Sequence, residues 1–258
     1  MIDSHCHLEQ PDYDKDRDDF IEHLKKELKA IVTSCAKPED FEKTLEIVER
    51  HKGFAFACIG LHPEHIRNIT EKELEIFLER IKLNKDKIVG IGEIGLDFYW
   101  VKERIDQEKQ KELFKQLIAF SKEIRKPMVI HCRDAHNETL DILEKEDAKH
   151  VLLHMWGEKN LLKRIEENGF YISIGPIIDK SKNHKKIARD FPIDRILLET
   201  DSPWFGGKTE KGDIIRGTPL NIKIPAGRIA EIKKISFEEV WKKCGENAVK
   251  FYKLPLSL

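Results

Sequence analysis

Four histidines and two carboxylates stand at the ends of short apolar segments that are spread along the sequence. They are His5, His7, Glu93, His131, His154 and Asp201. His5 and His7 lie two residues apart, so in a strand both side chains point to the same face and both can bind one ion. A single histidine or carboxylate at such a place is usually structural. Six of them, each ending an apolar segment, indicate a site for divalent metal ions.

These residues need elements that bring distant parts of the chain together. Short β-branched segments alternate with longer charged, amphipathic segments. The expected strands are Ile2–His7, Ala30–Cys35, Ala55–Gly60, Val89–Ile94, Met128–His131, Val151–His154, Tyr171–Ile174 and Ile196–Glu199. Expected helices include Lys37–Lys52, Thr70–Leu83, Asp106–Arg125, His136–Glu146, Asn160–Asn168 and Ser236–Phe251. Thr70 and Glu73 have the spacing of a capping box at a helix start.

The regular alternation of strands and helices predicts an α/β fold with a parallel sheet, and eight units close into a (β/α)8 TIM barrel. An open, doubly wound sheet is the alternative. It normally has a phosphate-binding loop after its first strand, and the sequence contains neither GxGxxG nor a Walker A motif. We expect residues 1–258 to form a single domain. In a barrel, all six residues point into the mouth at the C-terminal face, where catalytic residues gather.

Composition and charge exclude other classes of protein. The 258 residues are 40% hydrophobic and carry a net charge of −1, so no overall field attracts the chain to nucleic acid or to an anionic membrane. We expect neither a signal peptide nor a membrane span. Five scattered cysteines outside any CxxC spacing fit a reducing cytoplasm. Cys6 and Cys132 alternate with expected ligands and should point outward, under the helices.

The segment Phe205–Gly217, which follows the eighth expected strand, is long for a loop between a strand and a helix. Long loops of this kind tend to be functional. Lys208, Lys211 and Arg216 could line a path for a polyanion, and a solvated loop explains them equally well.

Five motifs together resemble the TatD family of metal-dependent hydrolases, within the amidohydrolase superfamily. They are Asp-Ser-His-Cys-His at 3–7, Gly-Leu-His-Pro at 60–63, Gly-Glu-Ile-Gly-Leu-Asp at 92–97, Ile-His-Cys-Arg-Asp-Ala at 130–135 and Glu-Thr-Asp-Ser-Pro at 199–203. The resemblance covers nearly the whole chain and implies a nuclease that acts on DNA, typically from a 3′ end. Some relatives are described as tRNA-linked deacylases, so an ester or amide hydrolase is the alternative. A binding protein without catalysis is disfavoured by the complete ligand set.

We expect the site to bind two divalent ions, which can activate a water and stabilise both reacting oxygens of a phosphodiester. The expected assignment is His5, His7 and Asp201 on one ion, His131 and His154 on the other, and Glu93 as the bridge. In this slot Glu93 replaces the carboxylated lysine that the superfamily often uses. Asp201 is also expected to take the proton of the attacking water. Imidazoles suit Zn²⁺, Mn²⁺ or Co²⁺, whereas assays of the family usually contain Mg²⁺.

Several neighbours of the ligands are expected to contact the substrate or the ligands. Arg133 should face the mouth and could bind a phosphate with two hydrogen bonds, or form an ion pair within its loop. His62, at the end of the third strand, could bind the same group. Asp3 and Glu199 each precede a ligand by two residues, which predicts hydrogen bonds to histidine rings, with a buried salt bridge as the alternative.

One segment departs from the family pattern. After His154 the family usually has Cys-Phe-Ser/Thr-Gly, and this chain has Met155-Trp156-Gly157-Glu158. If the strand continues, Trp156 lies at the mouth, where its indole could stack on an unpaired base of a nucleic-acid substrate. The alternative is a side chain that packs against a neighbouring loop.

Overall fold

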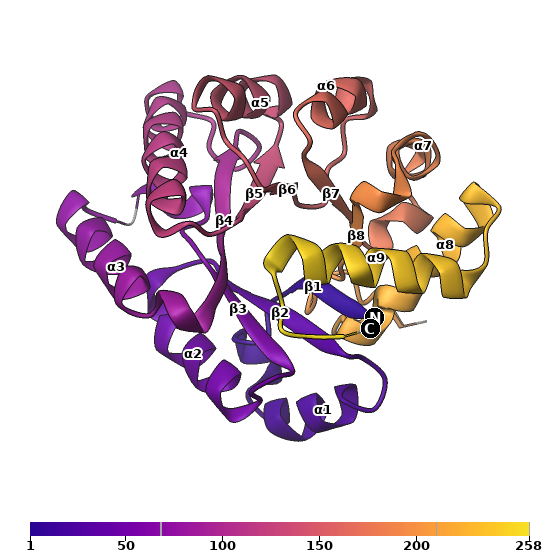
Figure 1. Ribbon diagram of the computed structural model, residues 1–258. Coiled ribbons are helices and arrows are strands. Elements are labelled where there is room, and N and C mark those ends of the chain that lie inside the picture. Colours follow the sequence, from indigo (N-terminus) through magenta and orange to yellow (C-terminus); the bar gives the residue numbers. More distant parts are fainter. Residues whose placement is uncertain (68, 210, 258) are drawn as a thin grey trace.

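Eight short, largely apolar segments form a ring of parallel strands surrounded by helices (Figure 1). The computed structural model describes residues 1–67, 69–209 and 211–257. The strands are β1 Ile2–Cys6, β2 Ala30–Cys35, β3 Ala55–Ile59, β4 Ile88–Asp97, β5 Met128–Arg133, β6 Val151–Leu153, β7 Tyr171–Ile174 and β8 Ile196–Leu198. The expected (β/α)8 barrel is therefore confirmed.

Nine α-helices are found in the described residues. They are α1 Arg17–Leu24, α2 Phe41–Arg50, α3 Glu71–Leu83, α4 Arg104–Ile124, α5 His136–Lys145, α6 Leu162–Glu167, α7 Lys182–Asp190, α8 Lys223–Lys233 and α9 Phe237–Tyr252. Helix α3 begins with the expected capping box of Thr70 and Glu73. No helix in the described part of the chain is long and apolar enough to cross a membrane.

Three helices, α1, α7 and α8, lie outside the ranges that the sequence predicts. In α7 the buried apolar residues are Ile187 and Ala188, which is too few for a helical repeat of apolar positions. Helix α8 contains Pro225 and Gly227, both poor helix formers. These three helices are stabilised by packing on the outside of the barrel. Their local sequence therefore contains little indication that a helix forms.

The barrel interior is closed at the end where the strands begin. A small apolar cluster there combines residues of the strands, such as Val32 and Val129, with Phe251 and Tyr252 of α9. The hydroxyl of Tyr252 donates a hydrogen bond to the carbonyl of Ser4 at 2.9 Å. In Figure 1, α9 lies across this end of the ring. The C-terminal ends of the strands therefore form the accessible mouth.

The strand ladders are irregular where expected ligands occur. The pairing of β1 with β2 shifts register between Asp3 and Cys6, and that of β4 with β5 shifts between Ile91 and Ile94. Such irregularities re-aim side chains and are common beside active sites. The thiols face away from the mouth as expected: Cys6 belongs to the outer apolar layer, and Cys132 accepts a hydrogen bond from Thr139 of α5 at 3.2 Å.

The backbone geometry explains why position 95, two residues after Glu93, is a glycine. A Cβ at this position would lie 2.0 Å from the carbonyl oxygen of His131, and the φ angle of Gly95 is +143°. Side chains rarely adopt that backbone conformation, so glycine is required for β4 to approach β5 so closely. This approach brings the end of β4 next to His131.

The ring closes between the last strand and the first. The hydroxyl of Ser4 donates a hydrogen bond to the carbonyl of Leu198 at 2.8 Å, and the hydroxyl of Thr200 donates to Asp3 at 2.5 Å. We call this junction of β1 and β8 the seam, meaning residues 3–7 and 198–202. Two of the expected ligand segments lie on its two sides.

Candidate metal centre and active site

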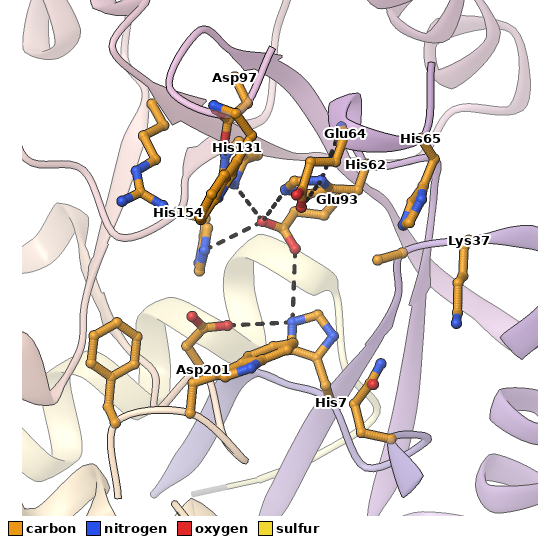
Figure 2. A pocket seen from close by; sticks show the side chains of 16 residues that line it. His7, Lys37, His62, Glu64, His65, Glu93, Asp97, His131, His154 and Asp201 are labelled. Carbon is orange, nitrogen blue, oxygen red and sulfur yellow. Dashed lines mark hydrogen bonds and ion pairs between the residues drawn. The ribbon is translucent and has the colours of Figure 1, made fainter. Parts of the chain in front are cut away.

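The six expected ligands converge at the mouth of the barrel. Five of them line a pocket of about 580 Å³: His7, Glu93, His131, His154 and Asp201. His5 is fully buried beside this pocket, and its Nε2 lies 3.1 Å from Nε2 of His7. In Figure 2, His7, Glu93, His131, His154 and Asp201 point toward one another. Residues that are far apart in the sequence thus form one cluster.

The carboxylate of Glu93 lies between two groups of imidazoles. Its Oε2 is 3.6 Å from Nε2 of His5 and 3.7 Å from Nε2 of His7. Its Oε1 is 2.8 Å from Nδ1 of His131 and 3.4 Å from Nε2 of His154. Figure 2 shows these two directions as dashed lines from Glu93. Each oxygen faces its own group, which is the arrangement a bridging ligand requires.

Asp201 completes the group on the Oε2 side. Its Oδ1 lies 3.3 Å from Nε2 of His7 and 3.6 Å from Nε2 of His5. Asp201 follows β8 in a left-handed conformation with φ of 52°, and its amide donates to the carbonyl of His5 at 3.0 Å. The side chain is 16% exposed, so it reaches both the imidazoles and the water-filled mouth.

Hydrogen bonds to the outer ring nitrogens fix the orientation of the histidines. Nδ1 of His7 lies 3.1 Å from Glu9, and Nδ1 of His154 lies 2.5 Å from Glu199. A carboxylate accepts a hydrogen from each of these nitrogens and leaves Nε2 with a free lone pair. Nδ1 of His5 lies 3.1 Å from the hydroxyl of Ser34.

The resulting donor set fits a metal ion. With Nδ1 protonated, the Nε2 lone pairs of His5 and His7 face each other at 3.1 Å, close to carboxylate oxygens of Glu93 and Asp201. Lone pairs and carboxylates in such proximity repel unless a proton or a metal cation lies among them. Imidazole nitrogens and carboxylate oxygens together are typical ligands of divalent transition metals.

Asp97 and Glu9 contact the rings of candidate ligands, and neither was predicted from the sequence to do so. Oδ2 of Asp97 lies 2.9 Å from Nε2 of His131, and its Oδ1 accepts a hydrogen bond from the amide of Trp100 at 2.7 Å. Both residues carried a usable signal. Glu9 continues the two-residue spacing of His5 and His7, and Asp97 ends the motif around Glu93.

The acidic surroundings control protonation in the cluster. Burial alone lowers the pKa of His154, but the charges of Glu199 and Glu93 outweigh it and raise the pKa to about 10. Burial raises the pKa of Glu93, and the charge of His154 with the hydrogen bond from His131 brings it well below its usual range. The cluster therefore keeps Glu93 ionised and favours positive charge at His154, either as a proton or as a metal ion.

The family described as TatD related DNase matches residues 2–253. The human protein Deoxyribonuclease TATDN3 is 35% identical, over 98% of this chain and 94% of its own length. The chain belongs to the TatD family. An uncharacterized metal-dependent hydrolase of this kind, YabD of Bacillus subtilis, is 33% identical over 98% of this chain and 99% of its own length. The protein is thus a metal-dependent hydrolase.

Solved structures of TatD family proteins have the same barrel. The TatD homolog YJJV of Escherichia coli superimposes with a TM-score of 0.87 at 22% identity, covering 99% of this chain and 98% of that one. A hydrolase of the TatD family from Entamoeba histolytica gives a TM-score of 0.87 at 23% identity, with 98% and 97% covered. At this identity the likeness bears on the fold alone.

Within this TatD family member, Arg133 and His62 lie beside the ligands. Both line the pocket. The guanidinium of Arg133 is exposed and lies 3.7 Å from the ring centre of Tyr99. Nε2 of His62 is 3.8 Å from Oε1 of Glu93. Burial and the positive charge of His131 lower the pKa of His62 to about 3, so its ring is neutral.

The expectation that Trp156 lies at the mouth is wrong. Its side chain is 1% exposed, its indole N–H donates to the carbonyl of Glu158 at 2.8 Å, and its ring packs against His136. Strand β6 ends at Leu153, and Met155 adopts a left-handed conformation with φ of 46°, so strand alternation does not continue to Trp156. Trp156 is therefore a buried packing residue in this TatD family member, which was the alternative prediction.

Two further expectations need correction. Asp3 accepts hydrogen bonds from the backbone and hydroxyl of Thr200 and from the amide of His5, and it orients no histidine ring. Arg216 donates to the carboxylate of Asp16 at 2.7 Å through two nitrogens and lies over the ring of Tyr13. It therefore has a structural partner. Glu199, by contrast, contacts the ring of a candidate ligand as the sequence predicts.

Proposed function

We propose that this TatD family member is a two-metal phosphodiesterase that removes nucleotides from the 3′ end of DNA. The observation that carries the proposal is the position of Glu93, whose two oxygens face two separate groups of imidazoles. The family description and the name of the human relative, a deoxyribonuclease, support DNA as the substrate. Divalent ions bound on either side of Glu93 would acidify a water and offset the charge of a phosphodiester.

The chain's own residues then divide the remaining work. Asp201, partly exposed at the mouth, accepts the proton of the attacking water. Arg133 donates two hydrogen bonds to a phosphate oxygen pair. His62, held neutral, donates or accepts one hydrogen bond at the same group. Glu199, Glu9 and Asp97 keep the imidazoles in position.

The proposed ligands are His5, His7 and Asp201 for one ion and His131 and His154 for the other, with Glu93 shared. Zn²⁺, Mn²⁺ and Co²⁺ suit this imidazole-rich set, and Mg²⁺ is the oxygen-preferring alternative. Elemental analysis after loading with Mn²⁺ or Zn²⁺ should approach two ions per chain. A ratio that stays at one in excess metal contradicts the bridged pair.

The substrate is tested with single-stranded DNA that carries a label at its 5′ or its 3′ end, and with an aminoacyl-tRNA. Each is incubated with the metal-loaded protein, with EDTA, and with metal restored. The proposal predicts release of the 3′ label as mononucleotide and a ladder of shortened 5′-labelled strands, both abolished by EDTA. Hydrolysis of the aminoacyl ester without cleavage of DNA contradicts it and favours a deacylase.

A further inference from the structure

In the part of the chain that the structure describes, the exposed Phe, Tyr and Trp side chains lie at the mouth of the barrel. Among the described residues, four aromatic side chains are exposed: Tyr99 at 40%, Trp100 at 57%, Trp204 at 49% and Phe205 at 43%. Tyr99 and Trp100 follow β4, and Trp204 and Phe205 follow β8. Large exposed aromatic groups are unfavourable in water, and where they gather beside a catalytic pocket they indicate a binding surface.

The two aromatic pairs lie on opposite sides of the metal cluster. Strands β4 and β8 are half a turn apart in the eight-stranded ring (Figure 1). Trp100 from one side and Trp204 and Phe205 from the other line the same pocket as Glu93 and Asp201. A linear polymer bound across the cluster would therefore contact aromatic side chains on both sides of the candidate metal site.

The pair after β4 is fixed in place next to a cation. The rings of Tyr99 and Trp100 meet edge to face at a centroid distance of 4.8 Å. The guanidinium of Arg133 lies over Tyr99 at 3.7 Å and over Trp100 at 5.5 Å. The amide of Trp100 is bonded to Asp97, which in turn contacts His131. The aromatic surface, the phosphate-binding cation and the candidate ligands thus form one connected unit.

The pair after β8 is anchored to the other group of candidate ligands. The ring of Trp204 meets the ring of His7 edge to face at 4.7 Å, and its amide donates to the carbonyl of Asp201 at 3.1 Å. Phe205 lies next to it in the chain and lines the same pocket.

We infer that these two aromatic pairs bind nucleobases on the two sides of the scissile phosphodiester, so that Trp100 and Phe205 hold the substrate strand on either side of the cleaved bond. The inference rests on the proposed function. Flat aromatic faces stack on any base, and this is how proteins bind single strands without sequence preference.

The test is a double-mutant cycle between protein side chains and bases. The variants are Trp100→Ala, Trp100→Phe and Phe205→Ala, and the control is Leu83→Ala at the end of α3, where the side chain is 76% exposed. Trp100→Ala keeps the backbone N–H that binds Asp97. Trp204 is left unchanged because it contacts His7. The substrates are one single-stranded DNA and a series in which a base-less tetrahydrofuran residue replaces one nucleotide at a time near the cleaved end.

Trp100→Ala should lower kcat/KM on the unmodified strand by roughly 5- to 150-fold, the range for loss of one stacked base. On the strand that lacks the base in contact with Trp100, the loss should shrink to less than about twofold, because no interaction remains to be removed. Trp100→Phe should keep most of the activity. Phe205→Ala should show the same behaviour with a different base-less position, and Leu83→Ala should behave as the unchanged protein.

Losses of equal size on every substrate overturn the inference, since they indicate a displaced site, and so does the absence of any loss. Disappearance of both losses at one and the same base-less position overturns the two-sided arrangement. The same measurements separate this inference from the proposed function. If the protein cleaves DNA with metal but the effects of the variants do not depend on the base-less position, only the base-binding inference is contradicted. If the unchanged protein cleaves no strand at all, both the inference and the proposed function are contradicted.

Discussion

Each imidazole of the cluster has one ring nitrogen toward the centre and the other toward a partner on its outer side. Three of these partners are carboxylates: Glu9 for His7, Asp97 for His131 and Glu199 for His154. A carboxylate in this position fixes the tautomer and increases the basicity of the ring. The ligands are therefore preorganised before any ion binds.

Glu199→Gln removes the negative charge behind His154. We expect the metal affinity of the site to fall by roughly 10- to 100-fold, the usual cost of losing such a partner. Competition with a chromophoric chelator measures the affinity. Glu144→Gln, which changes a surface carboxylate on α5, is the matched control. An unchanged affinity in Glu199→Gln means that the ring is held by its surroundings and that the carboxylate contributes little.

Asp201→Asn keeps the size of the side chain and one ligand oxygen but removes the proposed proton acceptor. At saturating metal we expect kcat to fall by at least about 100-fold, the scale of general-base catalysis. Circular dichroism should show an intact barrel. Near-normal turnover with full metal content would place the base elsewhere in the pocket.

At the scale of single residues, the sequence was sufficient to predict the positions of side chains that follow from strand alternation. His5, Glu93 and His131 lie in the C-terminal halves of β1, β4 and β5, and His7 and His154 directly follow β1 and β6. The structure brings these five residues together. Trp156 was placed wrongly because one residue, Met155, turns the chain through a left-handed conformation. Nothing in the local sequence distinguishes a methionine that continues a strand from one that ends it.

At the scale of elements, the strands were predictable because they are short, apolar segments that alternate regularly with longer charged ones. What the sequence does not show is the register shift in β1 and β4, which depends on pairing with neighbouring strands. The expected role of Asp3 assumed an unbroken strand face through to His5. The register shift of β1 lies between Asp3 and Cys6, so this face is interrupted. The carboxylate of Asp3 accepts a hydrogen bond from Thr200, on the other side of the seam.

Trp156→Ala tests the packing role of the segment after β6. The indole is almost completely buried, so its removal should lower the free energy of unfolding by roughly 3–5 kcal/mol. For a domain of this size that is a fall in Tm of about 10 °C. Calorimetry measures it, and Trp100→Ala is the matched control, since Trp100 is 57% exposed. Equal changes in both variants contradict the assignment.

At the scale of the whole molecule, the metal cluster lies across the seam. His5 and His7 belong to its first side and Asp201 to its second, and Ser4 and Leu198, which are bonded across it, are 194 residues apart in the chain. In the proposed assignment one ion is bound by residues of both sides, and it would stabilise the closed ring in addition to its chemical role.

Removal of metal should therefore destabilise the protein and affect the seam first. An ion present at about 100 times its dissociation constant contributes roughly 2.7 kcal/mol. We expect loading after EDTA treatment to raise Tm by roughly 5–10 °C. Hydrogen exchange should show protection gained in β1 and in residues 198–202, with little change in α4. Uniform protection, or none, contradicts a local effect at the seam.

The seam also connects folding to the lifetime of the bound ion. A bound ion acts as a reversible cross-link that closes a loop of nearly 200 residues, and closure of so long a loop is a large entropic cost for a barrel. His7 and Asp201 are in contact at 3.3 Å, and opening the ring would separate them. In the proposed assignment, in which both bind one ion, that opening would release the ion. Under the proposed assignment, kinetic stability and metal exchange would share one barrier, and the off-rate of the ion would report how often the barrel opens.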